Sequence, residues 1–258
     1  MTHAPHITVA PNGARLQKSD HVGVPVSKQE LAETARDCSA VGANAIHLHV
    51  RDNDGAHSLD PEIYREAIAH VKRSAPDIEI QITTESAGRY SVADQLHLIE
   101  TLRPSAASIS VREIARAPEL ISHVYSAAAR HETQVQHILY DVSCVALLEQ
   151  WLASGLVPYE MRDAIFVLGK YAPARAGKPS ELATLLNAAQ ALDLNITVCA
   201  FGPYEQACLI EAAKLGCDLR IGFENNTRTP TGASWDSNAQ AVASLKAALN
   251  VQGKETAA

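Results

Sequence analysis

Two histidines separated by a single residue, His47 and His49, carry the strongest chemical signal in the chain. They lie in residues 45–50, where apolar and β-branched side chains predict a strand. A two-residue spacing on a strand places both imidazoles on one face and Leu48 on the other. Two neutral imidazoles suit zinc, which in a catalytic site takes a third protein ligand and keeps an open position. Two histidines bonded inside a core are the alternative.

Glu224 is the predicted third ligand. It follows a predicted strand at 219–222, and in a closed barrel the end of that strand faces the same rim as His49. Arg220 has the same parity as Glu224 along the chain, so both side chains are expected to face inward. A guanidinium beside a metal can bind a carboxylate or stabilise an enolate, although a structural ion pair would also explain an inward arginine.

Hydroxyl side chains form a second inward set on two neighbouring predicted strands, at Thr83, Ser108 and Ser110. Taken alone, such residues are more often ordinary polar groups at a barrel rim than catalytic groups. His137 is interpreted as a core histidine, because the pattern of its strand does not say which face points inward. The remaining histidines of loops and predicted helices are expected to face solvent, at positions 57, 70, 97, 123 and 131.

Strands and helices that would position these residues alternate along the chain. Strict alternation requires parallel crossovers, and eight units suit a closed (β/α)8 TIM barrel of the α/β class. An open doubly wound sheet is the alternative, but no GxGxxG turn follows the first strand. The predicted strands are 7–10, 45–50, 78–83, 106–110, 134–140, 164–168, 196–200 and 219–222. The predicted helices are 27–41, 61–74, 91–102, 117–131, 143–154, 179–192, 203–215 and 235–249.

Helix boundaries carry their own sequence signals. Ser27 stands three residues before Glu30, which is the spacing of a capping box, and Asp60 precedes a proline that suits a first helical turn. Gly42 follows the first predicted helix, where a left-handed residue is favoured. These signals support the predicted bounds.

Composition excludes several classes of protein. The 258 residues are 47% hydrophobic and 20% charged, which is typical of a globular protein. A net charge of −7 without a basic block argues against a nucleic-acid surface, and no run is long enough to span a bilayer. Five scattered cysteines and the lack of a signal-peptide pattern predict a cytoplasmic protein. No linker divides the chain, so one domain is expected over residues 1–258.

Together these segments resemble the β-keto acid cleavage enzymes, the family typified by 3-keto-5-aminohexanoate cleavage enzyme. The similarity covers nearly the whole chain and is carried by ITVAPNGA at 7–14, HLHVRD at 47–52, Thr83-Thr84 and RIGFENN at 220–226. It implies a barrel fold, a homotetramer, and zinc held by His47, His49 and Glu224. It also implies that a β-keto acid and acetyl-CoA are converted to acetoacetate and a new acyl-CoA.

The resemblance also implies roles for the polar residues. The ketone and carboxylate of the keto acid would chelate zinc, which acts as a Lewis acid for an enolate. Thr83 would contact the carboxylate, and Ser108 matches a second hydroxyl of the family on the fourth strand. Thr84 and Ser110 belong to the same set of candidate substrate-binding residues. Arg220 would act with the residue at 225 in proton removal.

Three positions depart from the family pattern. Asn225 replaces an acidic residue, and an amide cannot accept a proton as a base does. The glycines that commonly follow the strand-3 threonines are Glu85-Ser86, and residues 136–141 lack the usual glutamates. The general base is therefore open, with Asp141, Glu85 and Glu113 as candidates.

The loop after the first predicted strand bears on the substrate. Family members that act on amino-bearing keto acids carry a glutamate after Gly-Ala, and Arg15 stands there in this chain. Charge complementarity favours an anionic or neutral polar tail on the substrate, unless Arg15 faces solvent or pairs with a loop carboxylate. The basic loop 170–178 could contact the phosphates of coenzyme A or simply be solvated.

Other functions remain open from sequence. The same ligands could serve a metal-dependent TIM-barrel lyase or hydrolase that does not use coenzyme A, or a metal-binding relative without catalysis. Two histidines and one carboxylate also suit manganese or iron.

Overall fold

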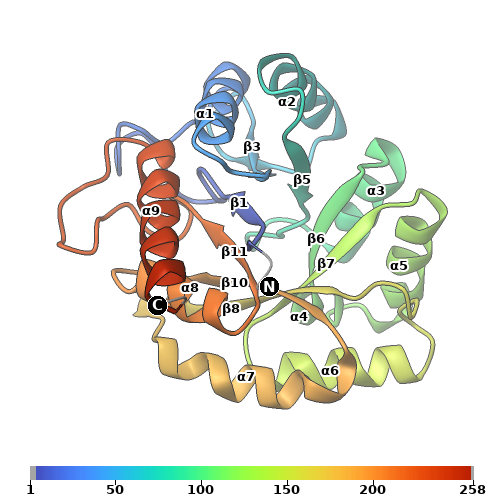
Figure 1. The fold of residues 1–258 in the computed structure, drawn as a ribbon. Helices are drawn as coiled ribbons and strands as arrows, with labels where there is room; N and C mark the ends of the chain where they lie inside the picture. Colours follow the sequence, from blue (N-terminus) through green and yellow to red (C-terminus); the bar gives the residue numbers. More distant parts are fainter. Residues whose placement is uncertain (1–3, 257–258) are drawn as a thin grey trace.

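Parallel strands surrounded by helices form a closed barrel in the computed structural model (Figure 1). The structure describes residues 4–256, so Met1–His3 and Ala257–Ala258 lie outside it. Both ends of the domain predicted over residues 1–258 therefore lie outside the described residues.

Within the described residues, eight parallel strands pair in the order β1, β2, β5, β6, β7, β8, β10 and β11. Strand β11 pairs with β1, which closes the barrel. This closure confirms the predicted TIM barrel and excludes the open sheet. The strands are β1 Ile7–Val9, β2 Ala45–Leu48, β5 Glu79–Thr83, β6 Ala106–Ser110, β7 Gln134–Leu139, β8 Asp163–Lys170, β10 Asn195–Ala200 and β11 Asp218–Ile221.

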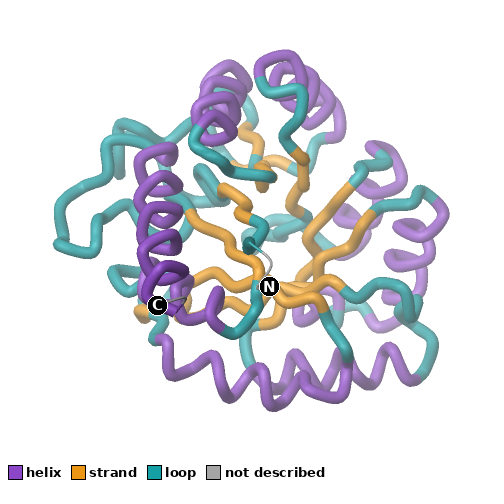
Figure 2. Tube along the Cα trace, in the orientation of Figure 1, coloured by secondary structure: helices purple, strands orange, loops and turns teal. Residues whose placement is uncertain are grey.

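Helices lie outside this barrel, as the purple segments around the orange strands show (Figure 2). They are α1 Lys28–Ala40, α2 Pro61–Ser74, α3 Val92–Leu102, α4 Val111–Ile114, α5 Ile121–Arg130, α6 Val142–Ala153, α7 Leu182–Ala189, α8 Glu205–Lys214 and α9 Asn238–Thr256. Short 3-10 turns are η1 Pro118–Leu120, η2 Pro179–Glu181 and η3 Gln190–Leu192. Two small antiparallel pairs join β3 Val50–Arg51 to β4 His57–Ser58, and β8 to β9 Arg175–Ala176.

The expected helix signals are present. Ser27 and Glu30 form a capping box at α1, and the Asp60 side chain accepts a hydrogen bond from the backbone N–H of Glu62 at the start of α2. Gly42 has a φ of 101°, the left-handed backbone expected after α1. Among the described helices, none is both long and apolar enough to cross a membrane.

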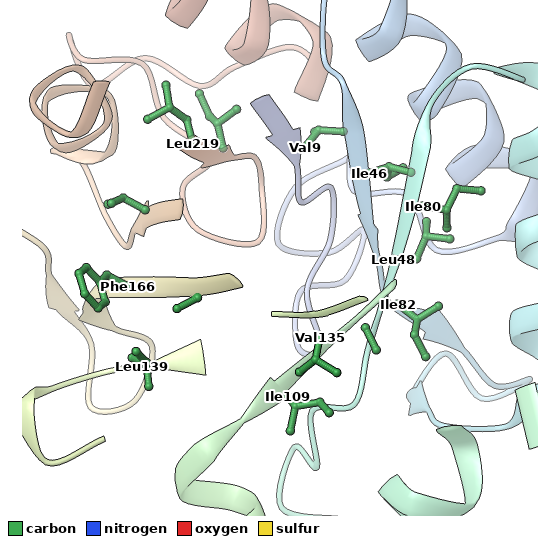
Figure 3. Packing of buried hydrophobic residues seen from close by; sticks show 14 of the residues in the cluster. Val9, Ile46, Leu48, Ile80, Ile82, Ile109, Val135, Leu139, Phe166 and Leu219 are labelled. Carbon is green, nitrogen blue, oxygen red and sulfur yellow. The ribbon is translucent and has the colours of Figure 1, made fainter. Parts of the chain in front are cut away.

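The main core fills the space between the strands and the helices. Figure 3 shows its apolar side chains from several strands, including Ile46 and Leu48 of β2 and Ile80 and Ile82 of β5. Leu48 therefore packs in this layer, as the alternation around His47 predicts. A smaller cluster of Ile138, Ile165, Val167 and Cys199 is separate from the main core.

His137 belongs to the core. On β7, Gln136 hydrogen-bonds to residues of other barrel strands, whereas His137 lies beside Tyr125 of α5, with ring centroids 5.5 Å apart. Its Nε2 is 3.1 Å from the carbonyl oxygen of Met161. The structure thus places His137 between the strand and the surrounding layer, which settles the orientation that the sequence left open.

Candidate metal centre and substrate pocket

The three predicted metal ligands meet at the barrel mouth. His47 Nε2 lies 3.2 Å from His49 Nε2, and Glu224 places one carboxylate oxygen 4.0 Å from His47 and the other 3.7 Å from His49. Ligand atoms at about 2.0–2.2 Å from one tetrahedral zinc ion lie roughly 3.3–3.6 Å apart. Glu224 Oε2 is buried without a hydrogen-bond partner among the described residues. The donor set and its spacing therefore fit a divalent metal.

His49 reaches this site from just beyond its strand rather than from within it. The ladder between β2 and β5 ends at Leu48, and the His49 carbonyl oxygen accepts a hydrogen bond of 3.0 Å from Asn12 Nδ2. The same amide donates to the carbonyl oxygen of Pro25 at 2.9 Å. Asn12 is fully buried, and its hydrogen bond to His49 links the loop after β1 to the loop after β2. This amide holds the backbone that carries His49.

Glycines allow Glu224 to enter the site. A Cβ at Gly13, where φ is +59°, would lie 2.6 Å from Glu224 Cγ. At Gly222, where φ is +146°, a Cβ would lie 2.3 Å from the carbonyl oxygen of Ala10. Larger residues at either position would displace the chain around Glu224.

Burial sets the charge states of this cluster. It lowers the pKa values of His47 and His49 well below their ordinary value, and the nearby Arg220 cation lowers that of His47 further. The imidazoles are therefore neutral, as metal ligands must be. Burial raises the pKa of Glu224, although Arg220 opposes that shift. Burial disfavours the charge on Arg220, but the Glu224 carboxylate, together with Cys199 and Tyr140, outweighs this and raises the arginine pKa.

Arg220 lies beside the cluster of His47, His49 and Glu224, with its side chain facing inward as its parity predicts. Its Nη2 is 3.5 Å from Glu224 Oε1 and 3.7 Å from Cys199 Sγ. Its Nε and Nη1 are buried without hydrogen-bond partners among the described residues. Since Arg220 also lines the pocket above the cluster, these two donors are available to a ligand.

The expectation that His57 faces solvent is wrong. His57 is 2% exposed, and its Nε2 is 2.8 Å from the carbonyl oxygen of Glu85. Its ring centroid lies 5.2 Å from that of His49. The hairpin of β3 and β4 turns the chain back against the barrel mouth and buries this ring, which lowers its pKa to about 4.

A pocket opens above the three predicted metal ligands, and Arg15 belongs to its lining. Arg15 Nη1 forms an ion pair of 2.8 Å with Glu85 Oε1, and its guanidinium lies 5.1 Å from the ring centre of Tyr171. Arg15 therefore pairs with a loop carboxylate, which was the alternative considered from sequence, and it still lines the pocket. Four cationic and three acidic side chains line this space: Arg15, Arg112, Lys170 and Arg220 against Glu85, Glu113 and Glu224.

The predicted hydroxyl contacts divide into two groups. Thr83 and Ser110 line the pocket, and Thr83 Oγ1 accepts a 2.9 Å hydrogen bond from the backbone N–H of Glu85, which leaves its hydroxyl proton free to donate. Thr84 Oγ1 instead donates to the carbonyl oxygen of Ser108 at 2.9 Å. Thr84 and Ser108 are buried, and neither belongs to the pocket lining.

Asn225 also lies outside the pocket lining. It is 6% exposed, and neither polar atom of its amide has a hydrogen-bond partner among the described residues. Its backbone is held by hydrogen bonds with Gly222 and Gly202. The structure thus gives no described hydrogen bond between the Asn225 side chain and Arg220.

The three candidate bases differ in their surroundings. Asp141 caps α6, and its hydrogen bonds, above all that from Ser143, lower its pKa. Glu113 lines the pocket, but both of its carboxylate oxygens accept hydrogen bonds, from Ser86 and Gln95. Glu85 lines the pocket with one oxygen paired to Arg15. Glu85 is therefore the best placed of the three.

Sequence reasoning missed several residues that build the site. Arg112 lines the pocket with its guanidinium 3.4 Å from the ring centre of Tyr140, and Arg51 Nη2 donates to the carbonyl oxygens of Gly13 and Leu16. Gln81 lies directly opposite His47 on the neighbouring strand. Position offers a signal for two of them, since Arg112 lies two residues after the end of β6 and Gln81 shares the inward parity of Thr83.

Comparison with known proteins places this geometry in a family. A family model described as beta-keto acid cleavage enzyme matches residues 6–258. The 3-keto-5-aminohexanoate cleavage enzyme of Fusobacterium nucleatum is 24% identical over 259 residues, which cover 97% of this chain and 93% of that protein. The 3-oxoadipate:acetyl-CoA acetyltransferase of Cupriavidus necator is 24% identical over 266 residues, with 100% and 92% covered.

Solved structures agree with the fold. The apo structure of ObcA has a TM-score of 0.71 at 15% identity over 90% of this chain, which spans 62% of the ObcA chain. Because that identity is low, the likeness concerns the barrel alone. The family model, by contrast, matches the sequence from the start of the barrel through its last strand, including both segments that bring the metal cluster together. The chain therefore belongs to the beta-keto acid cleavage enzyme family, and it is an enzyme.

Proposed function

We propose that this protein is a zinc-dependent enzyme that combines a β-keto acid with acetyl-CoA to give acetoacetate and a new acyl-CoA. The observation that carries the proposal is the cluster of His47, His49 and Glu224 beneath a pocket lined by more cations than acids. The name of the Cupriavidus relative, an acetyl-CoA acetyltransferase, supports acetyl-CoA as the second substrate.

His47, His49 and Glu224 would hold the metal, which supplies Lewis acidity for enolate formation from the keto acid. Arg220 would bind the substrate carboxylate or the developing enolate through its unpaired Nε and Nη1, because buried donors without partners gain most from such a charge-assisted contact. Thr83 and Ser110 would orient the substrate from the pocket wall. Thr84 and Ser108 would act from beneath, by fixing the ends of β5 and β6 against each other.

Glu85 is proposed as the general base. Its Oε2 would accept the proton from the carbon between the keto and carboxylate groups, while Arg15 holds Oε1. Asn225 would then contribute through its position beside Glu224 rather than by accepting a proton.

An anionic or neutral polar tail on the keto acid is proposed over an ammonium. Arg15, Arg112 and Lys170 all line the pocket, and a divalent metal would add to this positive charge. These cations also suit the phosphates of coenzyme A.

The remaining parts of the proposal are that residues 1–258 act as one cytoplasmic domain and that the enzyme is a homotetramer, which light scattering would measure.

The test is an assay of purified protein with a panel of β-keto acids and acetyl-CoA, in which each acyl-CoA product is identified by mass spectrometry. We expect a 3-oxo dicarboxylic or neutral keto acid to exceed 3-keto-5-aminohexanoate by tenfold or more in kcat/KM, since one charge-assisted contact contributes roughly 1.5–3 kcal/mol. Arg15→Glu should narrow or reverse that order. Consumption of the keto acid without acetyl-CoA would instead indicate a lyase or hydrolase.

Metal content gives an independent measurement. We expect about one zinc ion per chain, and its loss from His49→Ala with the fold retained, because two remaining ligands bind zinc weakly. His137→Ala serves as a control, since this histidine lies in the outer core. Full metal occupancy in a His47→Ala/His49→Ala variant would contradict the proposed ligands.

A further inference from the structure

Three polar side chains form a continuous row of hydrogen bonds that begins at His47. His47 Nδ1 is 2.7 Å from Gln81 Oε1, and Gln81 Nε2 donates to Gln136 Oε1 at 3.3 Å. Gln136 Nε2 in turn donates to Thr197 Oγ1 at 3.1 Å. The row joins β2, β5, β7 and β10 across the barrel interior, so we name Gln81, Gln136 and Thr197 the cross-barrel row.

The strand register brings the first two side chains of this row together. His47 and Gln81 are direct partners across the parallel pair β2 and β5. The same three side chains of the cross-barrel row also line a second cavity, which His6, Glu79 and Asp218 border. The row therefore forms a polar layer between the metal cluster and this second cavity. It is outside the pocket in which a substrate would bind.

Hydrogen-bond direction along this row decides which nitrogen of His47 carries its proton. An amide oxygen at Nδ1 requires a proton there, so Nε2 keeps its lone pair and faces His49 and Glu224. If the Gln81 amide were reversed, its N–H would face Nδ1 and the proton of a neutral His47 would move to Nε2. That tautomer could not bind a metal through Nε2.

Gln136 continues the first of these directions. Because Gln81 accepts from His47 through its oxygen, its N–H group needs an acceptor, which Gln136 Oε1 provides. The N–H group of Gln136 then needs an acceptor as well, which Thr197 provides. Donation in this arrangement runs in one direction from His47 to Thr197, so the orientation of each amide is coupled to that of the next.

The two histidines are not equivalent in this respect. His49 Nδ1 is buried without a hydrogen-bond partner among the described residues, whereas His47 Nδ1 has Gln81. Partners of this kind orient metal-binding histidines and fix their tautomers. Among the described residues, a side chain therefore orients the imidazole of His47 through its Nδ1, and none does so for His49.

We propose that Gln81 is a positioning residue that, supported by Gln136 and Thr197, keeps the proton of His47 on Nδ1 and so prepares Nε2 for the metal. This inference rests on the proposed metal site. It assigns no contact with the substrate to any residue of the cross-barrel row.

The first experiment needs no metal and no activity. Two-bond ¹H–¹⁵N correlation spectra of the metal-free protein report which imidazole nitrogen carries the proton, and the His47→Ala spectrum assigns the signals. We expect His47 of the unsubstituted protein to be in the Nδ1–H form, and Gln81→Leu to give a mixture of tautomers. The Nε2–H form in the unsubstituted protein would overturn the proposal, whether or not the protein proves to bind zinc.

The second experiment measures zinc affinity by competition with a chromophoric chelator. Gln81→Leu should weaken binding roughly tenfold to a hundredfold, the usual effect of removing such a partner. Gln81→Glu should restore most of the affinity, because a carboxylate oxygen still accepts from Nδ1. Gln136→Leu should have a smaller effect, and Gln134→Leu, on the same strand but bonded to Asp163, should have none.

These outcomes separate the two proposals. Zinc affinity that is the same in Gln81→Leu and the unsubstituted protein would overturn the positioning role and leave the metal site intact. Equal losses in Gln81→Leu and Gln81→Glu would also overturn it, since the acceptor oxygen would then be irrelevant. If Gln81→Leu does not fold, the spectrum of the unsubstituted protein and the affinity of Gln81→Glu still decide. Lack of zinc binding by the unsubstituted protein would contradict the proposed function itself.

Discussion

Buried polar atoms without partners gather around the proposed metal cluster. Arg220 Nε and Nη1, Glu224 Oε2 and both amide atoms of Asn225 are in this state among the described residues. Leaving a buried polar group unsatisfied costs about 1–3 kcal/mol, so native proteins keep few of them. Arg220 and Glu224 also line the pocket, so a bound metal or substrate would supply their missing partners.

Asn225 provides a test of the acid–base chemistry at the scale of one residue. Asn225→Asp should lower kcat by roughly tenfold or more, because a new carboxylate would be buried next to Glu224 and like charges disfavour each other's ionised forms. Steady-state kinetics with the best β-keto acid and acetyl-CoA measure this. Glu85→Gln should abolish turnover in the same assay.

Asn226→Asp is the matched control, since its side chain bonds to the backbone of Arg228 outside the pocket lining. A rise in kcat for Asn225→Asp would mean that the family acid–base pair is merely weakened in this chain. Glu85 would then lose its proposed role.

At the scale of single elements, the start of α8 carries a buried carboxyl group. Glu205 is 1% exposed and accepts a hydrogen bond of 3.2 Å from the backbone N–H of Gly222, next to the turn that leads to Glu224. Burial raises its pKa well above the ordinary value. The element that supports the proposed third metal ligand, Glu224, thus contains a group that resists ionisation.

This raised pKa predicts a pH-dependent stability. Between the unfolded pKa and the folded pKa, the folded state keeps the proton that the unfolded state has lost, so this carboxyl group destabilises the fold as pH rises. Glu205→Gln removes the ionisation and keeps an acceptor oxygen. Its free energy of unfolding should exceed that of the unsubstituted protein by an amount that grows as pH rises above 4.5, the ordinary pKa of this carboxyl group, at up to about 1.4 kcal/mol per pH unit.

Chemical denaturation at several pH values measures this difference. Glu211→Gln is the control, because that side chain lies on the same helix and is 42% exposed. Parallel stability profiles for Glu205→Gln and the unsubstituted protein would show that Glu205 is ionised in the folded state.

At the scale of the whole molecule, barrel closure creates the site. His47 and Glu224 are far apart in sequence, and they meet because β1 pairs with both β2 and β11. The same closure and its helical layer bury all five cysteines, which are free thiols. Burial raises their pKa values, to about 12 for Cys38 and Cys208 and about 11 for Cys199 and Cys217.

Thiol reactivity therefore reports on the intact barrel. An elevation of two to three pKa units lowers the thiolate fraction by roughly a hundredfold to a thousandfold. We expect the folded protein to react with an aromatic disulfide reagent only through unfolding, and the denatured protein to titrate five thiols at once. A thiol that reacts rapidly in the folded state would contradict the burial of that cysteine.

Local sequence patterns determined the elements and the face that each presents. All eight predicted strands are present with bounds shifted by no more than two residues, because apolar runs and alternation are local properties. The spacing of His47 and His49 and the parity of Arg220 and Glu224 likewise follow from the strand repeat. Strand order in a parallel barrel then brought the two segments to one rim.

Tertiary structure alone decided how deep each side chain lies and what it contacts. Periodicity gives a face but no depth, so it did not separate Thr83, which lines the pocket, from Ser108, which lies beneath it. It also did not reveal the burial of His57, because the two-residue strand β4 that carries it is too short to show a repeat. Hydrogen bonds between distant loops or strands, such as Asn12 to His49 and Gln81 to His47, exist only after closure sets the register.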